Sequence, residues 1–301
     1  MYYRRKIILG LLETFGGKID KIAFQKLLMI LSKSQDKPAY EFVPYKFGGV
    51  SFRAYADIRT MIKYEQIIED ESTQKGNKPA WIKSDKDDYF PLLKKNDQLL
   101  LNYIKDKFNN YSTDDLILYT YRKYPFYAIN STIAEKVLTP KELKKVNDAK
   151  PHSTKKALYT IGYEGISQEH YLNKLIKNDI KILCDVRKNP LSMKYGFSKN
   201  QLKNACSSLE IDYIHLPKLG IDGKKRKNLI NQCDYERLFE EYNQSLNSED
   251  ASEAIKELIL LLNQHQRVAI TCFEANIHQC HRKHLANKVN IKNKKFEVIH
   301  I

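Results

Sequence analysis

The sequence lacks a long hydrophobic run. No stretch of its 301 residues approaches the ~20 consecutive apolar residues that a helix needs to cross a bilayer. The N-terminal segment 1–17 combines charges with a short apolar run, but it has no small-residue cleavage site. We therefore expect a helix there instead of a signal peptide, and a protein without membrane contact.

Cysteine is scarce as well. The five cysteines are an odd number in a long chain without an export signal, which favours free thiols in a reducing compartment. The hydrophobic content of 42% and the charged content of 29% are typical of globular proteins. We therefore expect a cytoplasmic protein, with enough residues for two domains of ordinary size.

Positive charge is in excess. The chain has 51 Lys and Arg residues against 36 Asp and Glu residues, a net charge of +15. Such a charge favours a polyanionic partner, in the simplest case DNA or RNA. The alternative is a lysine-rich composition in which the charges only solvate helix faces. We expect a nucleic-acid partner.

The first part of the chain, residues 1–147, is predicted to be mainly helical. Two amphipathic segments are followed by an aromatic loop at 40–49 and a third helix that Ser51 caps. Residues 66–84 place a polar tip between two apolar pairs, which is typical of a two-stranded wing. This order of elements is the outline of a winged helix, whose third helix can enter a DNA groove.

Three cations on the third helix are candidates for phosphate contacts in that interpretation. They are Arg53, Arg59 and Lys63. In the alternative interpretation they are solvated helix charges, and the domain binds a protein partner.

The N-terminal half also resembles a known family. FQKLLMILSK at 24–33 and YEFVPYKFGGVSFRAYADIRTM at 40–61 are similar to the helical Panacea-type domain of antitoxins and phage-related proteins. The resemblance covers roughly residues 5–125. It implies an interaction or regulatory module and does not decide between DNA and protein as the partner.

The second part of the chain, residues 157–301, follows a polar linker at 148–156 that contains Pro151. Apolar runs alternate there with amphipathic segments, which predicts a Rossmann-like, mostly parallel sheet with helices on both faces. Right-handed crossovers put the strand-to-helix loops on one edge of such a sheet, where ligands bind. Four stretches should meet at that edge: 162–165, 185–192, 218–227 and 272–282.

These stretches supply the candidate catalytic residues. A carboxylate at a sheet edge can act as a general acid or base, and a cysteine beside cations and a helix N-terminus can act as a nucleophile. The alternatives are acids that only pair with lysines and a buried, inert cysteine. The candidate catalytic residues are Glu164, Asp185, Cys272 and Glu274.

The same stretches supply candidate binding residues. Asp185 and Arg187 share a face of their strand, so they can form a salt bridge that is structural, orients Arg187 for an anion, or does both. The candidate substrate-binding residues are Tyr163, Arg187, Cys280, His281 and Arg282. The candidate nucleic-acid contacts of this half are Lys224, Lys225, Arg226 and Lys227, on a basic loop that we expect to be exposed.

A metal site is the alternative use of the last stretch. Cys272, Cys280, His281 and His284 are ligand types, but their spacing is not a recognised zinc signature. We therefore assign no metal site, and the sequence leaves the cofactor unknown.

A second resemblance concerns this half of the chain. TIGYEG at 160–165, DVRKNP at 185–190, GFSK at 196–199, YIHLPKLG at 213–220 and CFEANIHQCHR at 272–282 are similar to the domain of unknown function 488 family. Met193 stands where many members have an arginine. The resemblance implies a Rossmann-like α/β domain with a polar site, and no particular reaction.

The hypothesis with the widest support is an enzyme directed at nucleic acid or nucleotides. It would be a hydrolase or transferase, with an N-terminal module that recruits DNA or a protein partner, and defence against foreign DNA is a candidate role. The alternative is a non-catalytic regulator that joins a winged helix to a ligand-sensing α/β domain. The sequence alone leaves open whether the protein is an enzyme.

Overall fold

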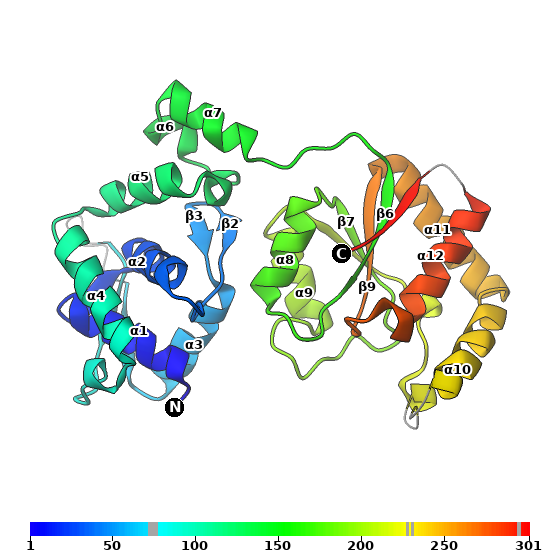
Figure 1. Ribbon diagram of the computed structural model, residues 1–301, viewed down its shortest axis with the longest axis horizontal. Coiled ribbons are helices and arrows are strands. Elements are labelled where there is room, and N and C mark those ends of the chain that lie inside the picture. Colours follow the sequence, from blue (N-terminus) through cyan, green and yellow to red (C-terminus); the bar gives the residue numbers. More distant parts are fainter. Residues whose placement is uncertain (72–77, 227–228, 230–231, 294–295) are drawn as a thin grey trace. The chain divides into compact units, whose positions relative to one another are not determined.

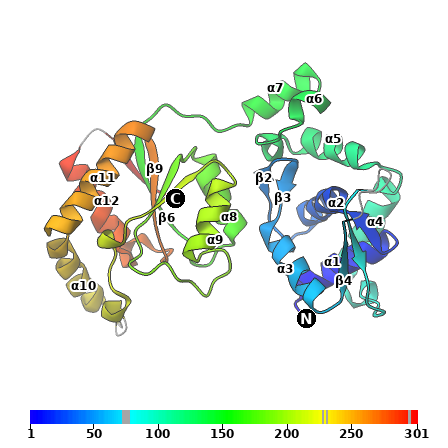
Figure 2. The ribbon, with the colours of Figure 1, turned by 180° about the vertical axis from the view of Figure 1, so that it is seen from behind.

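The chain forms two compact units in a computed structural model, Met1–Lys150 and Pro151–Ile301 (Figure 1 and, from behind, Figure 2). The structure describes residues 1–71, 78–226, 229, 232–293 and 296–301. The boundary between the units falls within the polar segment 148–156, where the linker is predicted. None of the described helices is both long and apolar enough to cross a membrane.

The N-terminal unit is built mainly from helices whose apolar residues recur at helical spacing. Asp20 caps α2 by accepting a hydrogen bond from the Ala23 amide at 2.7 Å, and Ser51 caps α3 in the same way. Its helices are α1 (Tyr3–Thr14), α2 (Lys21–Ser34), α3 (Phe52–Lys63), α4 (Lys95–Phe108), α5 (Thr113–Lys123), α6 (Ala134–Val137) and α7 (Pro140–Asp148).

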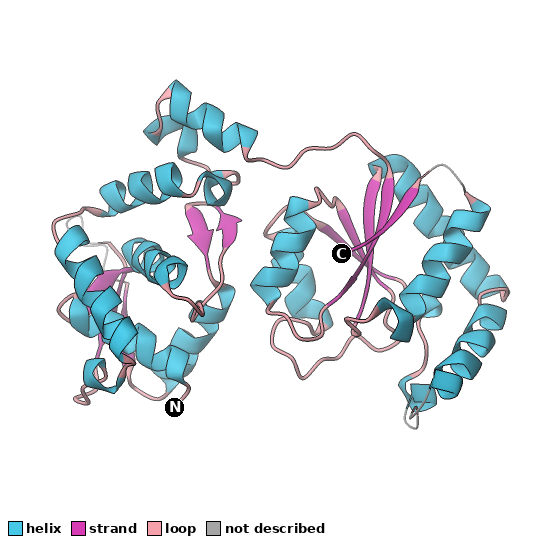
Figure 3. Ribbon diagram, viewed as in Figure 1, coloured by secondary structure: helices cyan, strands magenta, loops and turns pink. Residues whose placement is uncertain are grey.

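Two small antiparallel sheets complete this unit (Figure 3). In the first, β4 pairs with β5 as the predicted hairpin, and β1 adds to the other side of β5. In the second, the aromatic loop forms the hairpin β2–β3. The predicted hairpin tip, residues 72–77, lies outside the described residues. The strands are β1 (Lys18–Asp20), β2 (Val43–Tyr45), β3 (Gly48–Val50), β4 (Ile67–Asp70) and β5 (Ala80–Lys83).

The C-terminal unit is an α/β domain around a five-stranded sheet of order β10-β6-β9-β7-β8. Its strands all pair in parallel, so the predicted Rossmann-like parallel sheet is confirmed. The strands are β6 (Ala157–Gly162), β7 (Ile182–Asp185), β8 (Asp212–His215), β9 (Arg267–Cys272) and β10 (Glu297–His300).

Helices cover both faces of this sheet, α8 and α9 on one and α11 and α12 on the other (Figure 1). Leu258 and Leu285 from the second pair pack with Val268 and Ile270 of β9 in one buried cluster. Burial on both faces explains why β9 is apolar along its middle. The helices are α8 (Gln168–Lys177), α9 (Lys199–Ser207), α10 (Gln232–Ser245), α11 (Glu249–His265) and α12 (His281–Lys292).

Candidate functional site

A cleft of about 330 Å³ lies at the edge of the sheet where the parallel strands end. All four stretches that were predicted to meet contribute to its lining. The convergence follows from the parallel order of the strands, because their carboxyl ends share one edge. The polar and reactive groups of the lining include Tyr163, Arg187, Lys188, Arg226, Cys272, Glu274 and His281.

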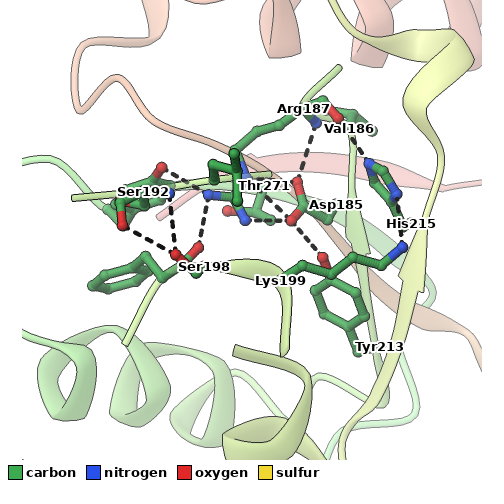
Figure 4. Close-up of polar contacts among 12 residues, drawn as sticks. Asp185, Val186, Arg187, Ser192, Ser198, Lys199, Tyr213, His215 and Thr271 are labelled. Atoms are coloured by element: carbon green, nitrogen blue, oxygen red, sulfur yellow. Dashed lines mark hydrogen bonds and ion pairs between the residues drawn. The ribbon is translucent and has the colours of Figure 1, made fainter. Parts of the chain in front are cut away.

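At the end of β7, Asp185 and Arg187 form the predicted ion pair inside a closed network (Figure 4). Arg187 Nε donates to Asp185 Oδ1 at 2.8 Å, and Arg187 Nη1 donates to the Tyr163 hydroxyl and the Phe197 carbonyl, each at 2.8 Å. Tyr213 donates to the second carboxylate oxygen at 2.6 Å. Burial alone would lower the pKa of the Arg187 guanidinium, but the hydrogen bonds and charge of Asp185 raise it above its ordinary value.

The loop after β7 is held in place by further hydrogen bonds. The Ser198 hydroxyl donates to the Ser192 carbonyl at 3.0 Å and accepts from the Ser192 amide (Figure 4). Ser198 is the residue before α9, yet its side chain makes no capping hydrogen bond. His215 contacts the Arg187 carbonyl through Nε2 at 2.9 Å. This side of the cleft is therefore preorganised by its own contacts.

At the end of β9, two cysteines and a histidine meet in the interior. Cys272 is the last residue of its strand, and Cys280 and His281 begin α12, so the strand and the helix bring them together. His281 Nδ1 lies 3.7 Å from Cys272 Sγ and 4.0 Å from Cys280 Sγ. His281 Nε2 lies 3.3 Å from the Val186 carbonyl oxygen. All three side chains are buried, and Cys272 and His281 line the cleft.

The two thiols differ in acidity. The hydrogen bond from Cys280 holds the pKa of the Cys272 thiol well below its usual value, against the effect of burial, and His281 and Arg226 act in the same direction. Burial and the neighbouring Cys272 raise the pKa of the Cys280 thiol. Cys272 is therefore the sulfur that more readily carries negative charge.

Arg226 enters the cleft. Its guanidinium pairs with the Glu274 carboxylate, and its Nη2 lies 2.8 Å from His281 Nδ1. The second oxygen of Glu274, Oε2, is buried and has no hydrogen-bond partner among the described residues. The sequence suggested instead that Arg226 belongs to an exposed loop that binds nucleic acid.

The other basic residues of that loop differ from Arg226. Lys224 and Lys225 are exposed, as predicted, and Lys225 pairs with Glu241 at 2.8 Å. Lys227 lies outside the described residues. The expectation of an exposed basic loop therefore needs correction at Arg226, because the ion pair with Glu274 draws this side chain into the cleft.

Two predicted site residues lie beside the cleft without lining it. Glu164 is exposed and accepts a hydrogen bond from the Ala275 amide at 2.9 Å. Arg282 is buried and donates to the Glu274 carbonyl at 2.8 Å, so it fixes the backbone of the loop. A Cβ at Gly162 would collide with the same carbonyl oxygen, which explains why this loop packs against a glycine.

Cys280 and Asp185 also lie behind the lining, each in contact with a residue that faces the cleft. Sequence reasoning missed Lys188, which is exposed and lines the cleft next to Arg187. The only sequence signal for Lys188 was its place in a stretch that was expected at the edge.

On α3, the three predicted phosphate contacts are not equivalent. Arg53 lies 3.8 Å from the buried carboxylate of Asp57, which also pairs with Arg4 and Arg5. Arg59 and Lys63 are exposed. The exposed cations among these three therefore lie in the C-terminal half of the helix.

Comparison with known proteins concerns the C-terminal unit alone. Residues 167–289 match the sequence model of a family described as "Domain of unknown function DUF488". The matched segment begins one residue before α8 and ends within α12, so it includes β7, β8 and β9 but no part of the N-terminal unit. No curated protein and no solved structure matched the chain.

Proposed function

We propose that the protein is a hydrolase or transferase that acts on nucleic acid or nucleotides, with its active site in the cleft of the C-terminal unit. One observation carries the proposal. Cys272, Glu274 and His281 share an open cleft with Arg226 at the edge of a parallel sheet where ligands bind. Acidic, basic and sulfur groups are thus available to one bound molecule.

The roles of the residues follow from their contacts. Arg226 holds its guanidinium in the cleft through Glu274 and His281, and its remaining N–H donors suit a phosphate oxygen. Glu274 has one carboxylate oxygen on Arg226 and the other without a partner among the described residues, so Oε2 is free to move a proton. The bond that breaks would be a phosphate or glycosidic bond of the substrate.

The N-terminal unit would recruit the nucleic acid as a winged helix. The order of α1, α2, α3 and the hairpin β4–β5, with β1 added to β5, supports this assignment. The exposed Arg59 and Lys63 on α3 would then contact phosphates, and the net charge of +15 would strengthen the association. A role in defence against foreign DNA rests only on the resemblance of this half to domains of antitoxins and phage-related proteins.

One observation favours the alternative of a non-catalytic regulator. Arg187 donates hydrogen bonds to Asp185, Tyr163 and Phe197. Arg282 is buried and donates to the Glu274 carbonyl. Two of the arginines that were expected to hold a substrate anion are therefore engaged within the protein. A regulator would bind a ligand in the cleft without turning it over.

The test of the active site compares two carboxylates beside the same loop. Full-length wild type would be assayed on oligonucleotides and nucleotides beside Glu274→Gln and Glu164→Gln. We expect Glu274→Gln to lower turnover by at least about 100-fold, the usual contribution of a general acid or base. Glu164→Gln should stay within a few-fold because its side chain lies outside the cleft. Equal effects of the two variants, or no turnover by the wild type, would contradict the proposal.

The test of the N-terminal unit measures the salt dependence of DNA affinity. Arg59→Ala/Lys63→Ala removes two phosphate contacts. The plot of the logarithm of the association constant against the logarithm of the salt concentration should therefore become less steep by about 1.8. The control is Lys95→Ala/Lys105→Ala, which removes two exposed lysines from α4. If both double variants bind like wild type, α3 is not the contact.

A further inference from the structure

We propose that Cys272, Cys280 and His281 bind a divalent zinc ion, with a fourth coordination position that faces the cleft beside Glu274. The ligand atoms of these four residues all lie within 4.8 Å of one another. Two thiolates and an imidazole form a donor set that suits Zn²⁺. The proposal deepens the proposed function by naming a cofactor for the same cleft.

The two nitrogen-to-sulfur distances fit one tetrahedral ion. Zn–S bonds of ~2.3 Å and Zn–N bonds of ~2.05 Å at tetrahedral angles put sulfur and nitrogen about 3.6 Å apart. His281 Nδ1 lies 3.7 Å from Cys272 Sγ and 4.0 Å from Cys280 Sγ. Shifts of a few tenths of an ångström in the side chains would close the site around the ion.

The histidine is already oriented for this role. Its Nε2 lies 3.3 Å from the Val186 carbonyl oxygen, an acceptor that places the ring proton on Nε2. Nδ1 then keeps its lone pair, and both sulfurs lie within 4.0 Å of it. Metal-binding histidines commonly donate their other ring nitrogen to a carbonyl or carboxylate in this way.

The charges also balance. Both sulfurs bind the ion as thiolates, and the two negative charges then neutralise it. The Glu274 carboxylate is already balanced by Arg226. Arg226 Nη2, which now contacts His281 Nδ1 at 2.8 Å, would give up that contact to the ion and keep the one to Glu274.

The position of the ligands makes this an open site. Cys280 is fully buried behind the lining, whereas Cys272, His281 and Glu274 line the cleft. Three protein ligands with an exchangeable fourth position are typical of catalytic zinc, which activates a bound water. The oxygen of Glu274 that lacks a partner among the described residues, Oε2, is a suitable acceptor for the proton of that water.

The spacing of the sequence pointed to a different fourth residue. His284, one helical turn after Cys280, packs its ring against Phe239 and lies 3.3 Å from the side-chain nitrogen of Asn243. It is not part of the cluster of ligand atoms. Glu274 joins the cluster instead, beside the open fourth position, because the loop after β9 folds back toward α12, held there by Arg282.

The experiment measures metal binding by the full-length protein, independently of turnover. Reduced protein would be loaded with Zn²⁺ or Co²⁺, freed of excess metal, and analysed for retained metal and for cobalt absorption. We expect stoichiometric metal and a thiolate-to-cobalt charge-transfer band with the visible bands of tetrahedral Co²⁺. The wild-type spectrum reports the ligands directly, so the result does not depend on variants that fold poorly.

Variants then identify the ligands. Cys272→Ser, Cys280→Ser and His281→Ala should each weaken binding by more than about 100-fold, since loss of an outer partner alone costs 10–100-fold. Cys233→Ser, an exposed thiol, and His284→Ala are the matched controls and should bind like wild type. Absence of stoichiometric metal, a cobalt spectrum without thiolate bands, or full binding by Cys272→Ser/Cys280→Ser would overturn the proposal.

Turnover assays keep the two proposals apart. Stoichiometric metal without turnover of any nucleic acid or nucleotide would remove the proposed function and leave the metal site standing. Turnover by wild type that binds no metal would remove the metal site and leave the function standing. Full turnover after the bound ion has been chelated would overturn the catalytic role of the open position.

Discussion

The ends of β7 and β9 are neighbours in the sheet, and each has an acidic side chain and an arginine close by. At the end of β7 the hydrogen bonds are closed, because Asp185 and Arg187 satisfy each other together with Tyr163 and Tyr213. After β9 the hydrogen bonding among the described residues is incomplete. Glu274 Oε2 and Arg282 Nε are buried without a hydrogen-bond partner among the described residues.

The difference in hydrogen bonding distinguishes a structural cluster from a candidate binding site. A buried polar atom without a partner costs about 1–3 kcal/mol, so a fold retains one where a ligand, ion or water can compensate. Both strand ends have a carboxylate and an arginine, and these groups differ in their degree of hydrogen bonding. Asp185, Arg187, Tyr163 and Tyr213, the closed cluster, support the wall of the cleft. Glu274, Arg226 and Arg282, the open cluster, would supply the chemistry that we propose for it.

The largest expected effect is on the closed cluster. Asp185→Ala leaves the buried Arg187 charge without its carboxylate and should lower the free energy of unfolding by about 3–5 kcal/mol. Denaturant unfolding of the full chain, followed by circular dichroism, measures the change. The control is Asp250→Ala, which breaks an exposed pair with Lys218 and should cost less than about 1 kcal/mol. Similar losses of unfolding free energy in the two variants would show that the buried pair stabilises the fold no more than the exposed pair does.

Lys26, a buried lysine that has no carboxylate partner among the described residues, is the opposite case to Arg187. Lys26 in α2 is buried, its Nζ donates to the Phe47 carbonyl, and burial lowers the pKa of Lys26 from 10.5 to about 7. Between those two values the unfolded chain binds the proton and the folded chain does not. Stability should therefore rise with pH across this window, by up to about 1.4 kcal/mol per pH unit.

Substitution of Lys26 tests this sign. In Lys26→Met the rise should disappear, and the gain in stability over wild type should be larger at pH 7 than at pH 9. Lys33→Met, on the exposed side of the same helix, should keep the wild-type slope. Unfolding free energies measured at several pH values give the comparison. An unchanged slope in Lys26→Met would show that this lysine is charged in the folded protein.

The smallest expected effect is on the open cluster. Arg226 and Glu274 are partly exposed, with side-chain accessibilities of 20% and 17%, so their ion pair contributes little to folding. Arg226→Ala should change the free energy of unfolding by about 1 kcal/mol or less. Denaturant unfolding beside Asp185→Ala provides the measurement. A loss as large as that of Asp185→Ala would make the two strand ends equivalent and remove the argument for a binding site.

Much of the fold could be predicted because its signals are local. The alternation of apolar runs and amphipathic segments after residue 157 predicts the parallel sheet, and the caps at Asp20, Ser51 and Ser167 mark where helices begin. The handedness of strand crossovers, which is common to proteins, then places four stretches at one edge. Residue order alone thus determined where a site could form.

Only the tertiary structure decided which side chains face that site. Arg282 was predicted to bind the substrate and Arg226 to contact nucleic acid from an exposed loop. In the structure Arg226 lines the cleft and Arg282 lies behind its lining. Loops such as 218–227 and 273–280 have no hydrophobic period to reveal the direction of a side chain. That direction depends on contacts with residues far along the chain, as in the pair of Arg226 with Glu274. For the same reason the spacing of ligand types suggested His284, whereas the folded loop brings Glu274 to Cys272, Cys280 and His281.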